Sequence, residues 1–132
     1  METINHECYV SLGVAKLLKE AGFDWECYEL YEREYEQDGR VHAVTSANWN
    51  SSLKYYSAPT LEVAQRWLRE IKNVVLLVDF NNDEDCEENE RYGVTIYIAK
   101  ERIIELATYP TYEEALETGI KKALEMILEK GE

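Results

Sequence analysis

The chain has 132 residues, of which 27 are acidic and 14 are basic, so that its formal net charge is −13. A single domain of this size buries about two-thirds of the surface that its unfolded chain exposes, and it needs neither a disulfide nor a metal to fold. Two prolines and six glycines exclude collagen-like and proline-rich classes, while 45% hydrophobic residues exclude global disorder. We therefore predict one globular domain over residues 1–132.

The charge balance restricts the class of partner. A net charge of −13 repels phosphate backbones, and the sequence contains no cluster of Lys and Arg, so we expect no direct binding of nucleic acid. Cations and basic protein surfaces remain as partners, and acidity is otherwise a means of keeping a small protein soluble. We expect a monomer or a small homo-oligomer.

The sequence carries no sign of export or of membrane insertion. The stretch METINHECYV holds acids before any base and lacks a long apolar run, and the longest apolar run, Val74 to Val78, is far shorter than the ~20 residues that span a bilayer. Cys8, Cys27 and Cys86 are widely spaced and odd in number, which indicates reduced thiols. We expect a cytoplasmic protein that does not bind membranes.

Three segments repeat apolar residues at helical spacing. Each begins after a residue whose side-chain oxygen can accept a backbone N–H, namely Ser11, Thr60 and Thr111. Glu114 completes a capping box with Thr111, and Gly22 ends the first segment. The predicted helices span residues 12–21, 61–71 and about 112–129.

Five segments have the composition of strands. Asp38-Gly39 predicts the turn of a first hairpin, and the apolar run 74–80 predicts a central strand covered by helices on at least one face. Residues 46–57 show no period and are predicted as a loop or a frayed edge. The predicted strands span residues 25–35, 41–45, 74–80, 92–99 and 103–108.

The resulting order of elements is α-β-β-α-β-β-β-α. This order predicts an α+β fold with an antiparallel or mixed sheet and helices packed on one face.

Three blocks of the sequence, each at the start of a predicted helix, carry a resemblance. They read YVSLGVAKLLKEAGFD over 9–24, SAPTLEVAQRWLRE over 57–70 and TYEEALETGIKKAL over 111–124, and together they cover about a third of the chain. In this order they resemble a family of small proteins, without an assigned activity, that phages, prophages and mobile elements of Bacteroides-type gut bacteria carry. The resemblance implies a cytoplasmic, bacterial or phage setting and supplies no catalytic motif.

The acidic loop over 81–90 belongs to a window with the ligand spacing of a calcium loop. Glu84 stands where the sharp turn of such a loop requires Gly, and the flanks are predicted strands instead of helices. We therefore favour a solvated acidic loop over a calcium site. The candidate ligands are Asp79, Asn81, Asp83, Asp85, Glu87 and Glu90.

No other pattern predicts catalysis or a cofactor. Signatures of serine hydrolases, P-loop proteins and dinucleotide-binding proteins are absent from the sequence. Cys8 precedes a predicted helix, but no basic neighbour is evident to activate its thiol. The remaining candidate metal ligands lack the paired spacings of a zinc site: His6, Cys8, Cys27, His42 and Cys86. We predict a protein that is not an enzyme and needs no cofactor.

Aromatic residues supply the candidate interaction site. Trp49 lies between two asparagines in a polar stretch, where it either folds back as a plug or is displayed as a binding anchor. Tyrosines close behind it and in the first hairpin could extend such an anchor into a surface. The candidate residues are Trp49, Tyr55, Tyr56, Tyr31 and Tyr35.

Three functions are compatible with these features. The first is a non-enzymatic protein-interaction module whose partner is a host or phage protein. The second is a small-molecule or calcium-binding protein. The third is an acidic nucleic-acid mimic that inhibits a host DNA-binding protein, which requires that the carboxylates of the first hairpin and of residues 83–90 converge on one side. The hairpin carboxylates are Glu26, Glu29, Glu32, Glu34, Glu36 and Asp38.

Overall fold

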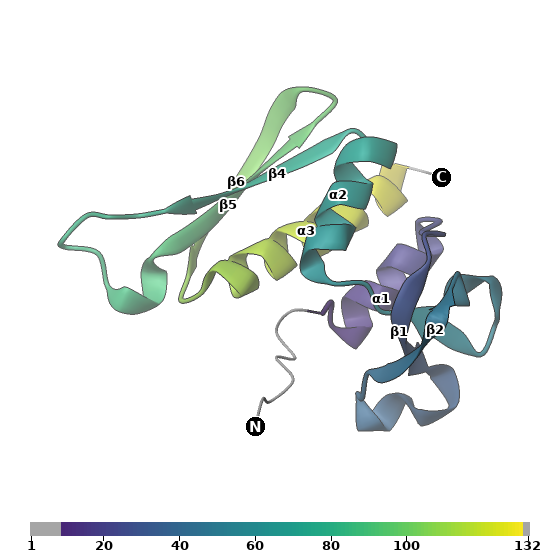
Figure 1. Ribbon diagram of the computed structural model, residues 1–132. Helices are drawn as coiled ribbons and strands as arrows, with labels where there is room; N and C mark the ends of the chain where they lie inside the picture. Colours follow the sequence, from purple (N-terminus) through teal and green to yellow (C-terminus); the bar gives the residue numbers. More distant parts are fainter. Residues whose placement is uncertain (1–8, 131–132) are drawn as a thin grey trace.

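A computed structural model of the chain describes residues 9–130. Within this range the chain forms three α-helices, two three-stranded sheets and short 3-10 turns (Figure 1). The helices are α1 (Leu12–Glu20), α2 (Leu61–Ile71) and α3 (Tyr112–Lys130). The strands are β1 (Cys27–Glu32), β2 (His42–Ala47), β3 (Tyr55–Ser57), β4 (Val74–Phe80), β5 (Tyr92–Ile98) and β6 (Glu101–Tyr109). The 3-10 turns are η2 (Arg33–Asp38), η3 (Trp49–Ser51) and η4 (Glu88–Glu90).

The three helices begin where their caps predict. The side-chain oxygens of Ser11, Thr60 and Thr111 accept the backbone N–H three residues further on, at 3.3, 3.2 and 3.1 Å respectively. In the capping box, the Thr111 hydroxyl also donates to the Glu114 carboxylate at 3.4 Å. Each cap satisfies one of the N–H groups that the first turn of a helix leaves without an intrahelical partner.

The α+β fold, the order of the predicted elements and the antiparallel pairing are confirmed, and β3 is one strand more than the sequence analysis predicts. The strands form two separate sheets, of order β2-β1-β3 and β4-β5-β6. β1 has a partner on each side, because Leu30 lies opposite His42 of β2 while Tyr31 lies opposite Tyr56 of β3. The first sheet is therefore complete before α2 begins. β3 is an edge strand within the segment predicted as a loop or a frayed edge.

The first hairpin is less regular than its sequence predicts. β1 ends at Glu32, and η2 replaces the last predicted strand residues, including Tyr35. Gly39 follows with φ 60°, a left-handed conformation that Gly adopts without the penalty of a Cβ. The connection is therefore longer than the two-residue turn that Asp38-Gly39 indicates.

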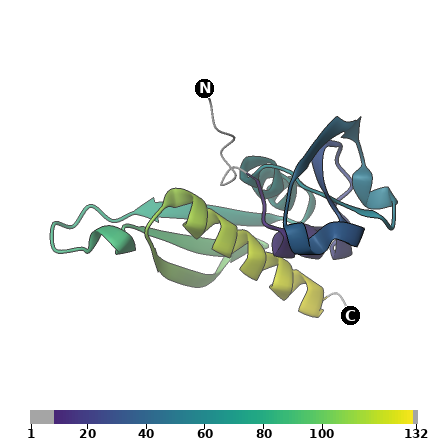
Figure 2. The same ribbon diagram turned by 90° about the horizontal axis from the view of Figure 1, so that it is seen from below.

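The core lies between the helices and the second sheet. α3 packs against β4, β5 and β6 and also contacts α1 and α2, so that it joins the two halves of the molecule (Figure 2). Trp67 and Phe23 are each 1% exposed, and their rings meet edge to face at 5.4 Å. Trp67 is thus a core residue. No helix of the described range combines the length and the apolar character that crossing a bilayer requires.

Gly119 allows the close approach of α3 to β5. A Cβ at this position would lie 2.8 Å from Cγ2 of Val94, a buried β-branched residue. Ala in place of Gly favours a helix by about 1 kcal/mol. Overpacking of a core costs about 1–3 kcal/mol, which outweighs that gain.

We expect Gly119→Ala to lower the free energy of unfolding by about 1 kcal/mol, measured by urea denaturation. Val94→Ala makes room for the new methyl group, so the same Gly119→Ala change in a Val94→Ala background should be neutral or stabilising. Equal destabilisation in both backgrounds would show that the contact between residue 119 and Val94 does not limit how closely α3 packs on β5.

Candidate functional site

β4 is an edge strand that lacks the usual protection of sheet edges. In the described range β4 pairs with β5 alone, over all seven of its residues and without a register shift. The opposite edge, β6, carries two register shifts and an ion pair between Arg102 and Glu105. Bulges and charges of this kind discourage pairing with another chain, whereas a regular apolar edge invites it.

The prediction that residues 74–80 form a central strand is therefore wrong. β5 is the central strand, because β4, β5 and β6 follow one another as a meander. An unbroken apolar run is typical of a strand that is buried on both faces. In this chain Leu77 is 49% exposed and Phe80 is 60% exposed.

Within residues 9–130, the backbone of β4 has hydrogen-bonding groups without a partner at its outer edge. The Gln65 side-chain amide donates to the carbonyl of Leu76 at 3.0 Å, which shows that this carbonyl points away from β5. Asn81 donates its N–H to the Arg91 carbonyl at 2.7 Å. The backbone N–H and C=O groups of the odd-numbered residues of β4 therefore point toward β5. Because the direction of these backbone groups alternates along a strand, the N–H and C=O of Val78 and of Phe80 point away from β5. β4 continues beyond α2 toward the loop that joins it to β5 (Figure 1).

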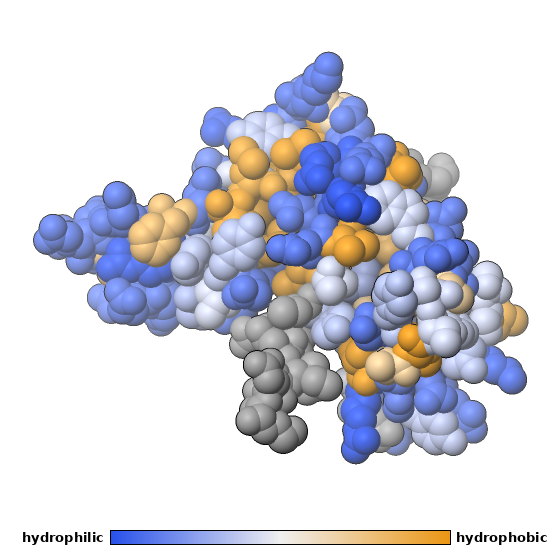
Figure 3. Space-filling model, viewed as in Figure 1, coloured by the Kyte–Doolittle hydropathy of each residue, from blue (hydrophilic) through white to orange (hydrophobic). Residues whose placement is uncertain are grey.

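Apolar side chains surround this part of the edge. Figure 3 shows them gathered where Figure 1 has β4, beside α2. Val75 and Val78 are half-buried, and Leu77 and Phe80 are exposed. We call these four residues the β4 patch. Because strand residues alternate, Val75 and Leu77 lie on one face of the sheet and Val78 and Phe80 on the other, so the patch flanks the edge on both faces. Exposed apolar side chains beside a free edge are typical of binding surfaces.

The acidic loop, residues 81–90, follows the β4 patch and has an ordered backbone. The Asn81 side-chain oxygen accepts the Asp83 N–H at 3.0 Å, and the Asp83 carboxylate accepts the Asp85 N–H at 3.0 Å. These are consecutive turns of the kind that Asn and Asp side chains form with their own backbone.

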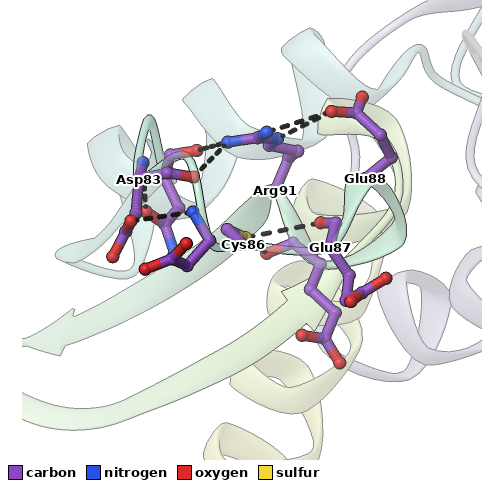
Figure 4. A network of polar contacts seen from close by, with 8 residues as sticks. Asp83, Cys86, Glu87, Glu88 and Arg91 are labelled. Atoms are coloured by element: carbon purple, nitrogen blue, oxygen red, sulfur yellow. Dashed lines mark hydrogen bonds and ion pairs between the residues drawn. The ribbon is translucent and has the colours of Figure 1, made fainter.

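Arg91 clamps the two ends of the acidic loop together. Its guanidinium donates to the carbonyls of Asn81 and Asp83 at 2.8 and 2.9 Å, and to the Glu88 carboxylate at 3.2 and 3.0 Å. Figure 4 shows Arg91 between Asp83 and Glu88. The guanidinium also lies 5.9 Å from the centroid of the Phe80 ring. Arg91, the basic residue next to the loop, is therefore bound to groups of the loop itself. The carboxylates that Arg91 does not bind remain available to a cationic partner.

The predicted calcium ligands are not brought together. Residues 9–130 contain no group of three or more His, Cys, Asp or Glu side chains placed to hold a metal ion. The Asn81 and Asp83 side chains accept backbone N–H groups, and the carbonyls of the same two residues accept Arg91. Arg91 thus takes the position near the loop carbonyls that a cation would need.

Trp49 folds back onto the first sheet. Its indole N–H donates to the carbonyls of Cys27 and Thr45 at 3.0 and 3.1 Å, and its ring meets Tyr55 edge to face at 5.6 Å. Half-buried in this way, Trp49 closes the end of the β1–β2 hairpin. The arrangement matches the plug and not the displayed anchor.

The predicted tyrosines do not form one surface. Tyr31 is 6% exposed and donates its hydroxyl to the Val10 carbonyl at 2.7 Å, and burial raises its pKa to about 12. Tyr31 is a core residue and is unavailable to a partner, which corrects its place among the candidates. Tyr56 is half-buried beneath Lys16 and Lys19, whose amines lie 5.8 and 5.2 Å from its ring. Tyr35, on η2, remains 53% exposed.

The candidate zinc ligands and the candidate nucleophile, which the sequence analysis did not favour, are partly outside the described residues. His6 and Cys8 lie there. Burial raises the pKa of the Cys27 thiol to about 12, which makes it an inert side chain. His42 lies 3.6 Å from Glu32 in the first sheet, and Cys86 lies in the acidic loop, where its thiol donates to the Glu90 carbonyl at 3.3 Å.

The two groups of carboxylates proposed for nucleic-acid mimicry lie apart. Figure 1 shows the loop between β4 and β5 at one end of the molecule and β1 with β2 at the other. A continuous phosphate-like row would require both groups on one face. This arrangement does not favour the mimic.

Hollows in the surface near the acidic loop are open to solvent. One, of about 400 Å³, lies beside Phe80, Tyr92 and Pro110. Another, of about 200 Å³, lies beside Gly93 and Ala107. Small-molecule sites usually enclose most of their ligand, which these hollows do not.

Comparisons of the chain with protein-family models, with curated proteins and with solved structures find no match. The resemblance to the Bacteroides-type family stays a prediction. The function therefore has to be inferred from the chain's own surface.

The strongest signal that the sequence analysis did not use is the apolar run of β4 running directly into the acidic loop. A strand that continues as Asp79-Phe80 into a solvated loop leaves its last apolar residues without a covering helix. The candidate functional site is accordingly the β4 patch together with the acidic loop.

Replacing Arg91 tests the order of the acidic loop. We expect Arg91→Ala to speed amide exchange at Asp83 and Asp85, measured by NMR, and to lower the free energy of unfolding by about 1 kcal/mol. Arg102→Ala is the matched control, because its ion pair with Glu105 lies on β6. Unchanged amide exchange in Arg91→Ala would show that the turns formed by the Asn81 and Asp83 side chains are enough to order the loop.

The ion pair between α1 and η2 makes stability depend on pH. Lys16 Nζ lies 2.5 Å from Glu36 Oε1, and this hydrogen bond holds the pKa of Glu36 below its ordinary value of 4.5 and that of Lys16 above 10.5. A lowered carboxyl pKa stabilises the fold above the ordinary value, and that contribution disappears as the pH falls through the lowered one.

We expect the melting temperature of Glu36→Gln to lie below that of the wild type at neutral pH and to approach it as the pH falls from the ordinary carboxyl pKa of 4.5 through the lowered pKa of Glu36. The melting temperature of Lys16→Met should differ from that of the wild type with the same dependence on pH. A difference that stays constant through the acid range would mean that the pair contributes packing and no charge interaction.

Proposed function

We propose that the protein is a non-enzymatic interaction module whose β4 patch and acidic loop bind a basic surface of a host or phage protein. The observation that supports this most is the exposed apolar edge of β4, which runs directly into an ordered acidic loop. The two features lie next to each other, so one partner can contact both.

The contributions of the two features differ. Burial of the exposed parts of Leu77 and Phe80 supplies affinity at roughly 25 cal/mol per Å² of apolar area. The loop carboxylates attract a basic partner over distances of the order of the Debye length, ~8 Å at physiological ionic strength, and so act mainly on the rate of association. Because Arg91 already orders the loop, binding loses less conformational entropy there.

The surface around Trp49 is less suited to this role. Its indole and the Tyr55 ring are engaged with the first sheet, and Tyr31 is buried. Exposed apolar residues of that half include Tyr35 and Leu53, which supply a control surface.

Affinity capture from a lysate of a Bacteroides-type bacterium, with quantitative mass spectrometry, tests the proposal. We expect wild type and Leu53→Glu to recover the same basic protein and Leu77→Glu to recover several-fold less, because a charge in the β4 patch loses its hydration on binding. Leu53 is 79% exposed and Leu77 is 49% exposed, so both variants should fold, which circular dichroism checks.

Two results would contradict the proposal. The first is equal recovery by Leu77→Glu and the wild type. The second is loss of recovery in Leu53→Glu alone, which would move the binding surface to the half of the chain that carries the first sheet.

A further inference from the structure

The outer edge of β4 has the properties of a site for strand addition. Its four outward backbone groups, the N–H and C=O of Val78 and of Phe80, follow from the direction of the Leu76 carbonyl that Gln65 binds. Gln65 and α2 cover the edge at Leu76, and β4 continues beyond them. The free part of the edge is thus bounded by α2 on one side and by the acidic loop on the other.

We propose that an extended segment of the partner, rich in Lys and Arg, pairs with β4 as a fourth strand of the second sheet. This inference rests on the proposed function and specifies how its partner binds. Backbone hydrogen bonds to Val78 and Phe80 supply the register, and the residues of the β4 patch on one face of the sheet accept apolar side chains from alternate positions of the segment.

Charge decides between this partner and a second copy of the chain. Each copy carries a formal net charge of −13, so pairing two copies brings like charges together. The free part of the edge contains Asp79 and is followed by Asp83, Asp85 and Glu87, which are exposed. A cationic segment is complementary to all of these groups.

The probe is a short synthetic peptide of alternating Lys and Val residues with a fluorescent label, and its binding is measured by anisotropy. A second peptide has the same side chains but is N-methylated at alternate residues, which removes the backbone donors without changing the charge. We expect the N-methylated peptide to bind about tenfold more weakly, because strand pairing depends on backbone hydrogen bonds.

Two protein variants locate the edge. Val78→Pro removes an N–H that points away from β5, so the sheet keeps its own ladder while one carbonyl of the added strand loses its hydrogen-bond donor. Glu105→Pro makes the same change at the outward edge of β6, because Ile104 and Leu106 point toward β5. We expect Val78→Pro to weaken peptide binding about tenfold and Glu105→Pro to leave it unchanged.

Salt and self-association complete the experiment. We expect peptide binding to weaken between about 0.05 and about 0.5 M NaCl, as attraction between exposed charges does. Equal binding of the two peptides, equal binding by Val78→Pro, or no binding of the unmodified peptide overturns strand addition. If analytical ultracentrifugation finds a dimer that Val78→Pro dissociates, the occupant is a second copy and the cationic segment is rejected.

The two proposals fail separately. If the peptide experiments reject strand addition but Leu77→Glu still reduces capture of the partner, the proposed interaction module is retained. Equal capture by Leu77→Glu and the wild type removes the interaction surface, whatever the peptides do.

Discussion

The contact between α3 and β5 is the constraint on which the rest of the structure depends. Gly119 lets the helix axis come so close to the sheet that a Cβ there would lie 2.8 Å from a methyl group of Val94. With α3 seated on β5, the same helix also contacts β4, β6, α1 and α2. The second sheet and the helices α1 and α2 are therefore packed against one helix, whereas the first sheet contacts α1 through β3.

This arrangement explains why the second sheet leaves part of itself free. α3 covers one face, which buries alternate residues of β4 and β5 such as Leu76, Val94 and Ile96. α2 is eleven residues long and reaches only the first part of β4, where Gln65 binds the Leu76 carbonyl. The chain has no further element for the rest of β4 within residues 9–130. The exposed apolar edge is thus a consequence of how far α2 extends.

The distribution of charge follows a similar logic. The acidic loop could not hold its compact form through its carboxylates alone, since like charges at short range repel one another. Arg91 removes part of that repulsion by pairing with Glu88 and by binding the carbonyls of Asn81 and Asp83. The loop is therefore both ordered and acidic, and its position at the end of β4 places that charge beside the apolar patch.

Local features of this chain were predictable from the sequence because local interactions determine them. Ser11, Thr60 and Thr111 cap helices through hydrogen bonds that span three residues, and β5 forms where apolar and polar residues alternate. The fold class followed from the order of these elements. Tertiary structure alone decided that β4 is an edge, that Trp49 turns inward and that Tyr31 is buried. Each of these depends on which distant segments become neighbours, and hydrophobic periodicity carries information about the buried side of an element but none about its neighbour.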